Sequence, residues 1–313
     1  MTAIETDLNV QQRRGVGRGM AWAVLSAATF GLSGSLGKSL MEIGWSPVAV
    51  VGARIGGAFL VLLVPTVILL RHSARPSARQ SRRLVTYGVV AVALAQLCYF
   101  SAVQYLSVAT ALLLEYLAPV LLIGWQWLRT RTRPAGTVFA GAAIAMGGMV
   151  LVLDVVNGLS LSPVGVLWGL GAAVCLCSYF LLSDHQSSGD SVAPLLMTTV
   201  GTGVGALVIF AVGAAGLLPL TFELRDTSLA GQDVPWWLPV ALLVLVSAAL
   251  AYLTGIIAVR RLGSSLASFV SLSEVVFAVV FAIFLLGQQP SFSQAVGGVL
   301  VLAGIATVQR RSS

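Results

Sequence analysis

The chain has 313 residues, of which 58% are hydrophobic and only 9% are charged, and its formal net charge is +7. Ordinary soluble domains carry about 25% charged residues, so this composition excludes a soluble enzyme and indicates an integral membrane protein. The basic balance does not indicate nucleic-acid binding, because the arginines stand in short runs between apolar segments, where they act as orientation signals.

The first 18 residues are polar and carry Arg13, Arg14 and Arg18 directly before an apolar run. This pattern resembles the start of a signal peptide. Nine more apolar runs follow, however, so we expect a basic flank that stays in the cytoplasm before a permanent first span.

Ten apolar runs are each about long enough to cross a bilayer as a helix. They cover residues 19–39, 47–70, 84–104, 107–128, 136–153, 163–183, 192–218, 236–259, 264–286 and 291–308. The runs are rich in Gly and Ala, which let membrane helices pack closely. The sequence therefore predicts an all-α integral membrane protein with ten transmembrane helices.

Arginine decides the expected orientation, because cytoplasmic loops carry an excess of basic residues. With the N-terminus inside, 15 arginines lie in cytoplasmic segments: Arg13, Arg14, Arg18, Arg71, Arg75, Arg79, Arg82, Arg83, Arg129, Arg131, Arg133, Arg260, Arg261, Arg310 and Arg311. The other side has only Lys38 and Arg225, and Arg54 lies within a span. We therefore expect a multi-pass protein of the cell (plasma or inner) membrane with both termini in the cytoplasm. The longest polar connection, about 221–235, should be a short loop on the outer side.

The fourth span holds two residues that are costly in a membrane helix, Glu115 and Pro119. A charge near mid-bilayer costs about 2.5–3.5 kcal/mol on insertion scales, and proline removes a backbone hydrogen bond and kinks the helix. The pair predicts a kinked helix that faces protein or a water-filled cavity.

The two halves of the chain resemble each other in sequence. An offset of 156 residues aligns Pro134 with Pro290, Gly141 with Gly297 and Gly148 with Gly304, and an offset of 146 aligns Trp22 with Trp168. Five spans per half would insert the second half upside down, as in many alternating-access carriers. We therefore predict two inverted five-helix repeats, 19–153 and 162–308, with an N-terminal tail 1–18, an outer linker 154–161 and a C-terminal tail 309–313.

Three segments resemble the EamA branch of the drug/metabolite transporter superfamily: 21–38 (AWAVLSAATFGLSGSLGK), 108–127 (VATALLLEYLAPVLLIGWQW) and 268–287 (SFVSLSEVVFAVVFAIFLLG). The resemblance extends over nearly the whole chain and implies a secondary transporter, most often an exporter. Characterised relatives carry amino acids, other metabolites, sugars, nucleotide sugars or drugs.

The chain departs from the family pattern at three positions. Ala118 stands where Glu is common before the Pro-Val step, Val275 replaces the Pro of a Glu-Pro-Val step, and Gln288 replaces the Glu of a Gly-Glu step. These departures leave the expected fold intact but weaken the transfer of specific residue roles.

Glu115 and Glu274 are the carboxylates that lie well inside predicted spans. The 156 offset aligns Glu115 with Ser271 and Ala118 with Glu274, so the two acids stand one turn apart on corresponding helices. If these helices face each other, both acids line one cavity, where they could bind a proton or a substrate ammonium. The alternative is a structural acid satisfied by Ser or backbone groups.

Arg54 lies in the second span, and an intramembrane arginine needs a partner. One reading has it snorkel to the outer interface or bridge helix ends, and the other has it bind a substrate carboxylate. Lys38 is expected to be an interface anchor or a gate residue.

Polar and aromatic side chains follow one face of the first helix of each half. Trp22, Thr29 and Ser33 share a face, and the 146 offset maps them onto Trp168, Cys175 and Tyr179. Such residues suit a small-molecule pocket, although interfacial anchoring explains the two tryptophans equally well. Further candidate lining residues are Gln96, Tyr99, Tyr252 and Ser271.

No metal or cofactor is expected. Cys98, Cys175 and Cys177 fall inside apolar spans without a CxxC spacing, and neither His72 nor His185 has a neighbour at ligand spacing. We expect the cysteines to be small core residues.

The favoured function is a secondary transporter that exports a small, amino-acid-like metabolite, with the lipid bilayer as its environment and protons as a candidate coupling ion. Multidrug or cation efflux and solute uptake remain alternatives within transport. A membrane enzyme would need a cluster of catalytic residues, and the sequence shows no such cluster. A non-transporting scaffold would be favoured by an appended soluble domain, and the sequence shows no such domain. Substrate identity and oligomeric state are not encoded in any recognisable motif.

Overall fold

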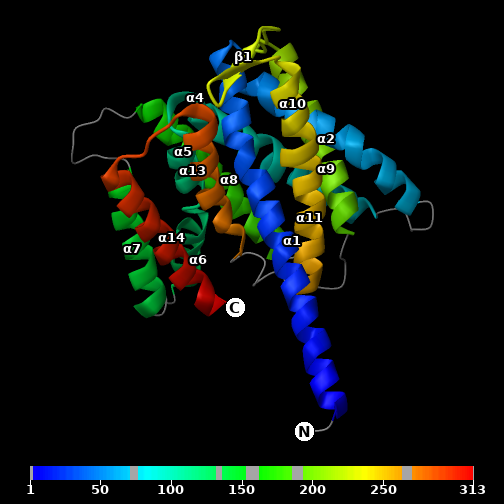
Figure 1. The fold of residues 1–313 in the computed structure, drawn as a ribbon, viewed down its shortest axis with the longest axis vertical. Helices are drawn as coiled ribbons and strands as arrows, with labels where there is room; N and C mark the ends of the chain where they lie inside the picture. Colours follow the sequence, from blue (N-terminus) through cyan, green and yellow to red (C-terminus); the bar gives the residue numbers. More distant parts are fainter. Residues whose placement is uncertain are drawn as a thin grey trace.

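The structure is a computed structural model that describes residues 3–70, 77–131, 136–152, 162–184, 193–262 and 270–312. It is a helical bundle with one small hairpin (Figure 1). The first half contains α1 Ala3–Glu42, α2 Pro47–Leu70, α3 Ala78–Tyr87, η1 Gly88–Leu94, α4 Ala95–Tyr105, α5 Val108–Glu115, α6 Ala118–Thr130 and α7 Gly136–Val152. The second contains α8 Pro163–Asp184, α9 Pro194–Ala214, β1 Thr227–Leu229, β2 Gln232–Val234, α10 Trp237–Val244, η4 Leu245–Leu250, α11 Ala251–Leu262, α13 Ser273–Leu286 and α14 Phe292–Ser312.

Within the described part of the chain, five stretches of helix are long and apolar enough to cross a membrane. They are Gly17–Glu42, Pro47–Ile68, Ala78–Tyr105, Leu195–Ala214 and Trp237–Ala258, and shorter apolar helices cover Phe139–Val152, Pro163–Ser178, Ser273–Leu286 and Phe292–Thr307. The chain is thus a multi-pass helical membrane protein, and the number ten stays a prediction. Helix α1 begins at Ala3, so most of the expected tail 1–18 is helical, and its assignment as a cytoplasmic tail stays a prediction.

Two irregular features recur at equivalent places in the two halves. The π-helical segment η1 covers 88–94, and the 156 offset moves it to 244–250, where η4 covers Leu245–Leu250. A turn at Tyr116 and Leu117 separates α5 from α6, and the corresponding turn lies at Leu272, directly before α13. π-helical turns inside α-helices are frequent at functional sites.

Helices α7 and α14 form a pair at one side of the bundle (Figure 1). A Cβ added to Gly148 would lie 2.7 Å from the carbonyl oxygen of Gly297, and one added to Gly304 would lie 2.5 Å from that of Gly141. The backbones touch where side chains are missing, as in other close membrane helix pairs. The later glycine of α7, Gly148, meets the earlier glycine of α14, Gly297, and the earlier Gly141 meets the later Gly304. The two helices are therefore antiparallel.

Packing partners also correspond between the halves. The long helix α1 packs on α11 and α13, and its counterpart α8 packs on the equivalent helices α4 and α6 and also on α5. The part of α1 nearer its C-terminus is largely buried, with Leu36 and Leu40 at 1% and 0% exposure. Figure 1 shows its N-terminal end extending beyond the other helices.

The hairpin caps the end of the bundle where α1 finishes (Figure 1). β1 and β2 pair in antiparallel register, with Thr227 opposite Val234. The hydroxyl of Thr227 donates to the Ser39 carbonyl of α1 at 2.7 Å, and the backbone N–H of Ala230 donates to the Leu285 carbonyl of α13 at 2.9 Å. The loop between α9 and α10 therefore ties the ends of α1 and α13 together.

Candidate functional site

The site begins at the break in the predicted fourth span. The side chain of Ser107 accepts a hydrogen bond from the Thr110 N–H at 3.2 Å and so starts α5, which ends at Glu115. Pro119 lies in the first turn of α6, where its missing N–H costs nothing. The helix therefore stops before Pro119 and restarts, which leaves Glu115 and Tyr116 at the junction.

Tyr116 connects this junction to the corresponding junction of the second half. Its hydroxyl donates to Oε2 of Glu274 at 3.1 Å, with the Ser271 carbonyl oxygen 3.5 Å away. Glu274 is in the first turn of α13. Gly31 of α1 packs against the same turn, because a Cβ there would lie 2.9 Å from the Glu274 carbonyl oxygen. The two broken helices thus meet through one tyrosine and one carboxylate.

The two acids belong to one electrostatic cluster. Glu115 interacts electrostatically with both Glu274 and Arg54, and Glu274 also interacts with Arg54. Tyr99 of α4, which is 6% exposed, lies in the field of all three groups. The cluster therefore holds two acidic side chains and one guanidinium.

Arg54 is enclosed in the bundle and is only 2% exposed. Its Nη1 donates to Oε1 of Gln96 on α4, and its Nη2 donates to the Ser247 carbonyl in η4 at 3.1 Å. The guanidinium carbon also lies 5.9 Å from the ring centre of Phe30 and 6.0 Å from that of Phe100, within the range of a cation–π contact. Snorkelling to the outer interface does not describe this side chain, because it points inward to these partners.

The Nε–H of the guanidinium is left without a hydrogen-bond partner among the described residues. Arg54 Nε and the Ser247 hydroxyl are both buried, and the hydroxyl also lacks a partner in the described part of the chain. A buried polar group without a partner costs free energy. An arginine with an unused N–H beside two acids is therefore suited to receive a polar group from a ligand.

The remaining expected lining residues are spread along the helices. Tyr252 packs edge-on against Phe30, with ring centres 5.0 Å apart. Ser33 is buried, and Trp22 and Trp168 are half-buried. The side chain of Tyr179 lies outside the described residues.

Two polar residues of α1 bond to helix ends or to their own helix. The Thr29 hydroxyl donates to the Leu25 carbonyl at 2.8 Å, so it is used within α1. Lys38 donates to the carbonyls of Val103 and Leu106 at 3.1 and 2.8 Å. It therefore holds the C-terminal end of α4, where a cation is favourable.

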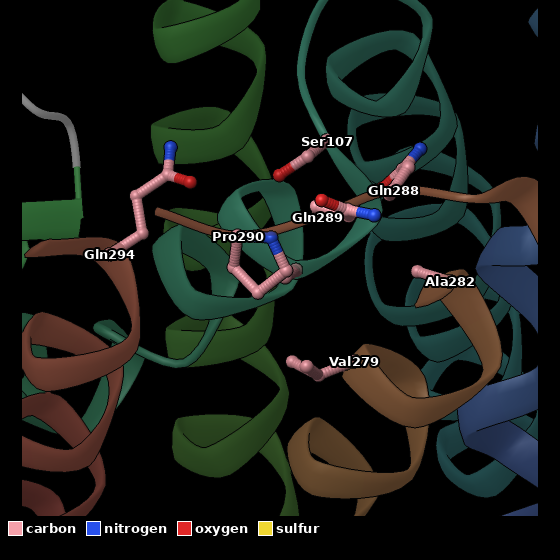
Figure 2. A pocket seen from close by; sticks show the side chains of 8 residues that line it. Ser107, Val279, Ala282, Gln288, Gln289, Pro290 and Gln294 are labelled. Atoms are coloured by element: carbon pink, nitrogen blue, oxygen red, sulfur yellow. The ribbon is translucent and has the colours of Figure 1, made fainter. Parts of the chain in front are cut away.

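A small pocket is lined by residues that do not belong to the charged cluster (Figure 2). It is lined by Ser107, Ala109, Val279, Ala282, Gln288, Gln289, Pro290 and Gln294. Figure 2 shows neutral amide and hydroxyl groups there. Oε1 of Gln288 accepts from the Val108 N–H at 3.3 Å, so the residue that replaces the family's expected Glu bonds to the start of α5.

The sequence did not predict three contributors to the cluster: Tyr116, the Ser247 carbonyl, and the rings of Phe30 and Phe100 that contact Arg54. Tyr116 had one available signal, because a tyrosine beside an intramembrane acid needs a partner for its hydroxyl. The Ser247 carbonyl had none, since a backbone acceptor in a π-helical turn leaves no mark in residue type.

The family model described as "EamA-like transporter family" matches this chain twice, over residues 17–154 and 163–309. Curated relatives carry matching names. The chain is 21% identical to the uncharacterized inner membrane transporter YicL of Salmonella typhimurium, over 93% of this chain and 95% of that protein. It is 26% identical to an uncharacterized transporter of Archaeoglobus fulgidus, over 93% and 96%, and 25% identical to the uncharacterized transporter YwfM of Bacillus subtilis, over 72% of each.

A solved crystal structure also aligns with the fold. The alignment covers 92% of this chain and 95% of the other, with a TM-score of 0.61 and 17% sequence identity. At that identity the likeness concerns the fold alone.

Proposed function

Because the chain belongs to the EamA-like transporter family, we propose that it is a secondary carrier that exports a small organic solute by alternating access. In this proposal ten spans form two inverted five-helix repeats, 19–153 and 162–308, with both termini in the cytoplasm. The transported solute is amino-acid-like, and protons are the coupling ion.

Contacts between α7 and α14 support the inverted arrangement. The contact between Gly148 and Gly297 becomes the contact between Gly304 and Gly141 when each residue is replaced by its partner at the 156 offset. Contacts that exchange in this way are those that a two-fold axis produces. The antiparallel course of the two helices agrees with an axis in the membrane plane, the symmetry of many alternating-access carriers.

The observation that carries the solute class is the cluster of Glu115 and Glu274, which lie at the two helix breaks, with Arg54 of α2. Carriers commonly bind their solutes at broken helices near the repeat interface. An ammonium group would be attracted by the acids, and a carboxylate would find the unused Nε–H of Arg54. Groups of opposite sign within one site suit a zwitterion.

The test is transport by purified protein in proteoliposomes. We would measure counterflow of radiolabelled amino acids, sugars, nucleosides and a lipophilic cation, with an imposed pH gradient. Uptake of amino acids should exceed that of the other classes, and Glu115→Gln should reduce it at least tenfold. The matched control is Glu42→Gln, an exposed acid at the end of α1, which should transport at the wild-type rate.

Transport restricted to the lipophilic cation would replace the amino-acid assignment by cation efflux, which the excess of acid in the cluster also suits. No counterflow of any solute, in protein that remains folded, would overturn the proposal.

A further inference from the structure

We infer that the two half-buried acids have different tasks and that Tyr116 is the positioning residue that separates them. Glu274 is kept as a fixed negative charge, and Glu115 is the acid that takes up and releases the mobile cation. This inference rests on the proposed carrier function and assigns roles within its site.

The surroundings of Glu274 favour a carboxylate that stays charged. The Tyr116 hydroxyl donates to its Oε2 at 3.1 Å. Glu274 is also the second residue of the 14-residue helix α13, and the unpaired N–H groups of a helix N-terminus stabilise negative charge. A donor and a helix end therefore act on this acid together.

Glu115 has the opposite position in its own helix. It is the last residue of α5, where the carbonyl ends disfavour a negative charge. Among the residues that the structure describes, none donates a hydrogen bond to its side chain. The hydrogen bonds that the two Nη groups of Arg54 make go to Gln96 and to the Ser247 carbonyl, not to Glu115. The charge on Glu115 is thus weakly compensated, which leaves this acid open to a proton or a solute cation.

The pairing of a tyrosine with a glutamate is not repeated at the equivalent positions of the two halves. The 156 offset aligns Tyr116 with Leu272 and Glu274 with Ala118. Leu272 is 8% exposed and Ala118 is 0% exposed, so the equivalent place is occupied by two buried apolar side chains. The hydrogen bond between Tyr116 and Glu274 therefore breaks the approximate symmetry of the site.

Among the described residues, the other charged or titratable groups of the cluster do not distinguish the two carboxylates by a direct contact with only one of them. Arg54 of α2 and Tyr99 of α4 interact with both carboxylates. Cys98 of α4 and Cys175 of α8 interact with Glu115, but a thiol does not supply a fixed charge. Tyr116 is the group whose hydroxyl contacts one acid directly.

The experiment is pH-difference infrared spectroscopy on purified full-length protein in detergent, with no solute added. Wild-type protein should show one buried carboxylic-acid band that appears and disappears with pH. Glu115→Gln should remove this band, and Glu274→Gln should keep it. In Tyr116→Phe, Glu274 loses its donor, so a second acid band should appear and should vanish in the double variant with Glu274→Gln.

The matched control is Tyr105→Phe, a 48% exposed tyrosine one helix away, whose spectrum should equal that of the wild type. A merely structural role for Tyr116 would lower the melting temperature without adding an acid band. If Tyr116→Phe does not fold, the two single Gln variants still decide between the acids.

The assignment is overturned if Glu274→Gln removes the wild-type band, if Glu115→Gln keeps it, or if folded Tyr116→Phe has the wild-type spectrum. Because no solute enters this measurement, its outcome is separate from the transport test. If the infrared bands behave as expected but no solute is transported, only the carrier proposal is overturned.

Discussion

At the scale of single residues, Arg54 shows how a membrane protein accommodates a charge. Its guanidinium has an amide acceptor, a backbone carbonyl and two aromatic faces, from Gln96, Ser247, Phe30 and Phe100. The carbonyl belongs to a π-helical turn, where the normal helical bonding pattern is altered. The same side chain therefore binds α2 to α4 and η4 and offsets the charge of the acids.

Replacement of Arg54 should reveal this dual role. In Arg54→Met the Gln96 and Ser247 acceptors would lose their donor, and each orphaned buried group costs about 1–3 kcal/mol. We expect a clearly lower melting temperature in detergent. Arg225→Met is the control, because that arginine is 68% exposed in its ion pair with Glu223, and such a surface change should alter stability by less than about 0.5 kcal/mol. Equal melting temperatures for the two variants would contradict the burial of Arg54 among partners.

The acids were predictable at this scale and Tyr116 was not identified. A carboxylate inside an apolar run is rare, so Glu115 and Glu274 could be singled out from composition. The partner of Tyr116 comes from 158 residues further along the chain, and sequence spacing does not encode which distant groups meet.

At the scale of elements, the glycines of α7 and α14 set the distance between the two helices. Gly148 faces the partner backbone, whereas a Cβ on its neighbour Gly147 would meet nothing within 4 Å. The periodic glycines were visible in the sequence as a repeated pattern, but which face each one occupies depends on how the helices dock.

These neighbouring glycines allow a matched test. Gly148→Ala should push α14 away from α7 and destabilise the protein by about 1–3 kcal/mol, as overpacking does. Gly147→Ala adds the same methyl group into open space and should not destabilise. Thermal unfolding of the two variants in one detergent would measure the difference, and matching melting curves would be evidence against close backbone contact here.

The helix breaks differ in how far they could be foreseen. Pro119 predicted a kink, and the structure places the interruption just before it, at Tyr116 and Leu117. The equivalent turn at Leu272 has no proline, because Val275 stands where relatives have one. The π-helical segments η1 and η4 were likewise not predicted, since their residues are ordinary helix formers in a membrane.

At the scale of the whole molecule, the arginines predict the orientation of the chain in the membrane. The distribution of arginines predicts that the hairpin loop is outside and both termini are inside. A cysteine-free protein with Arg225→Cys should react with a membrane-impermeant maleimide in intact cells. The same protein with Ser312→Cys should react only after the membrane is opened. Labelling of Ser312→Cys in intact cells would contradict the predicted orientation.

The sequence by itself determined the class of molecule, because the apolar runs, the sparse charge and the internal similarity follow from residue types along the chain. It also singled out two acids and an arginine as costly and therefore informative. Only the tertiary structure decided that Tyr116 bonds to Glu274, that Arg54 turns inward to η4, and that Gly148 rather than Gly147 meets α14. These are contacts between segments far apart in the chain, and their geometry depends on how whole helices pack.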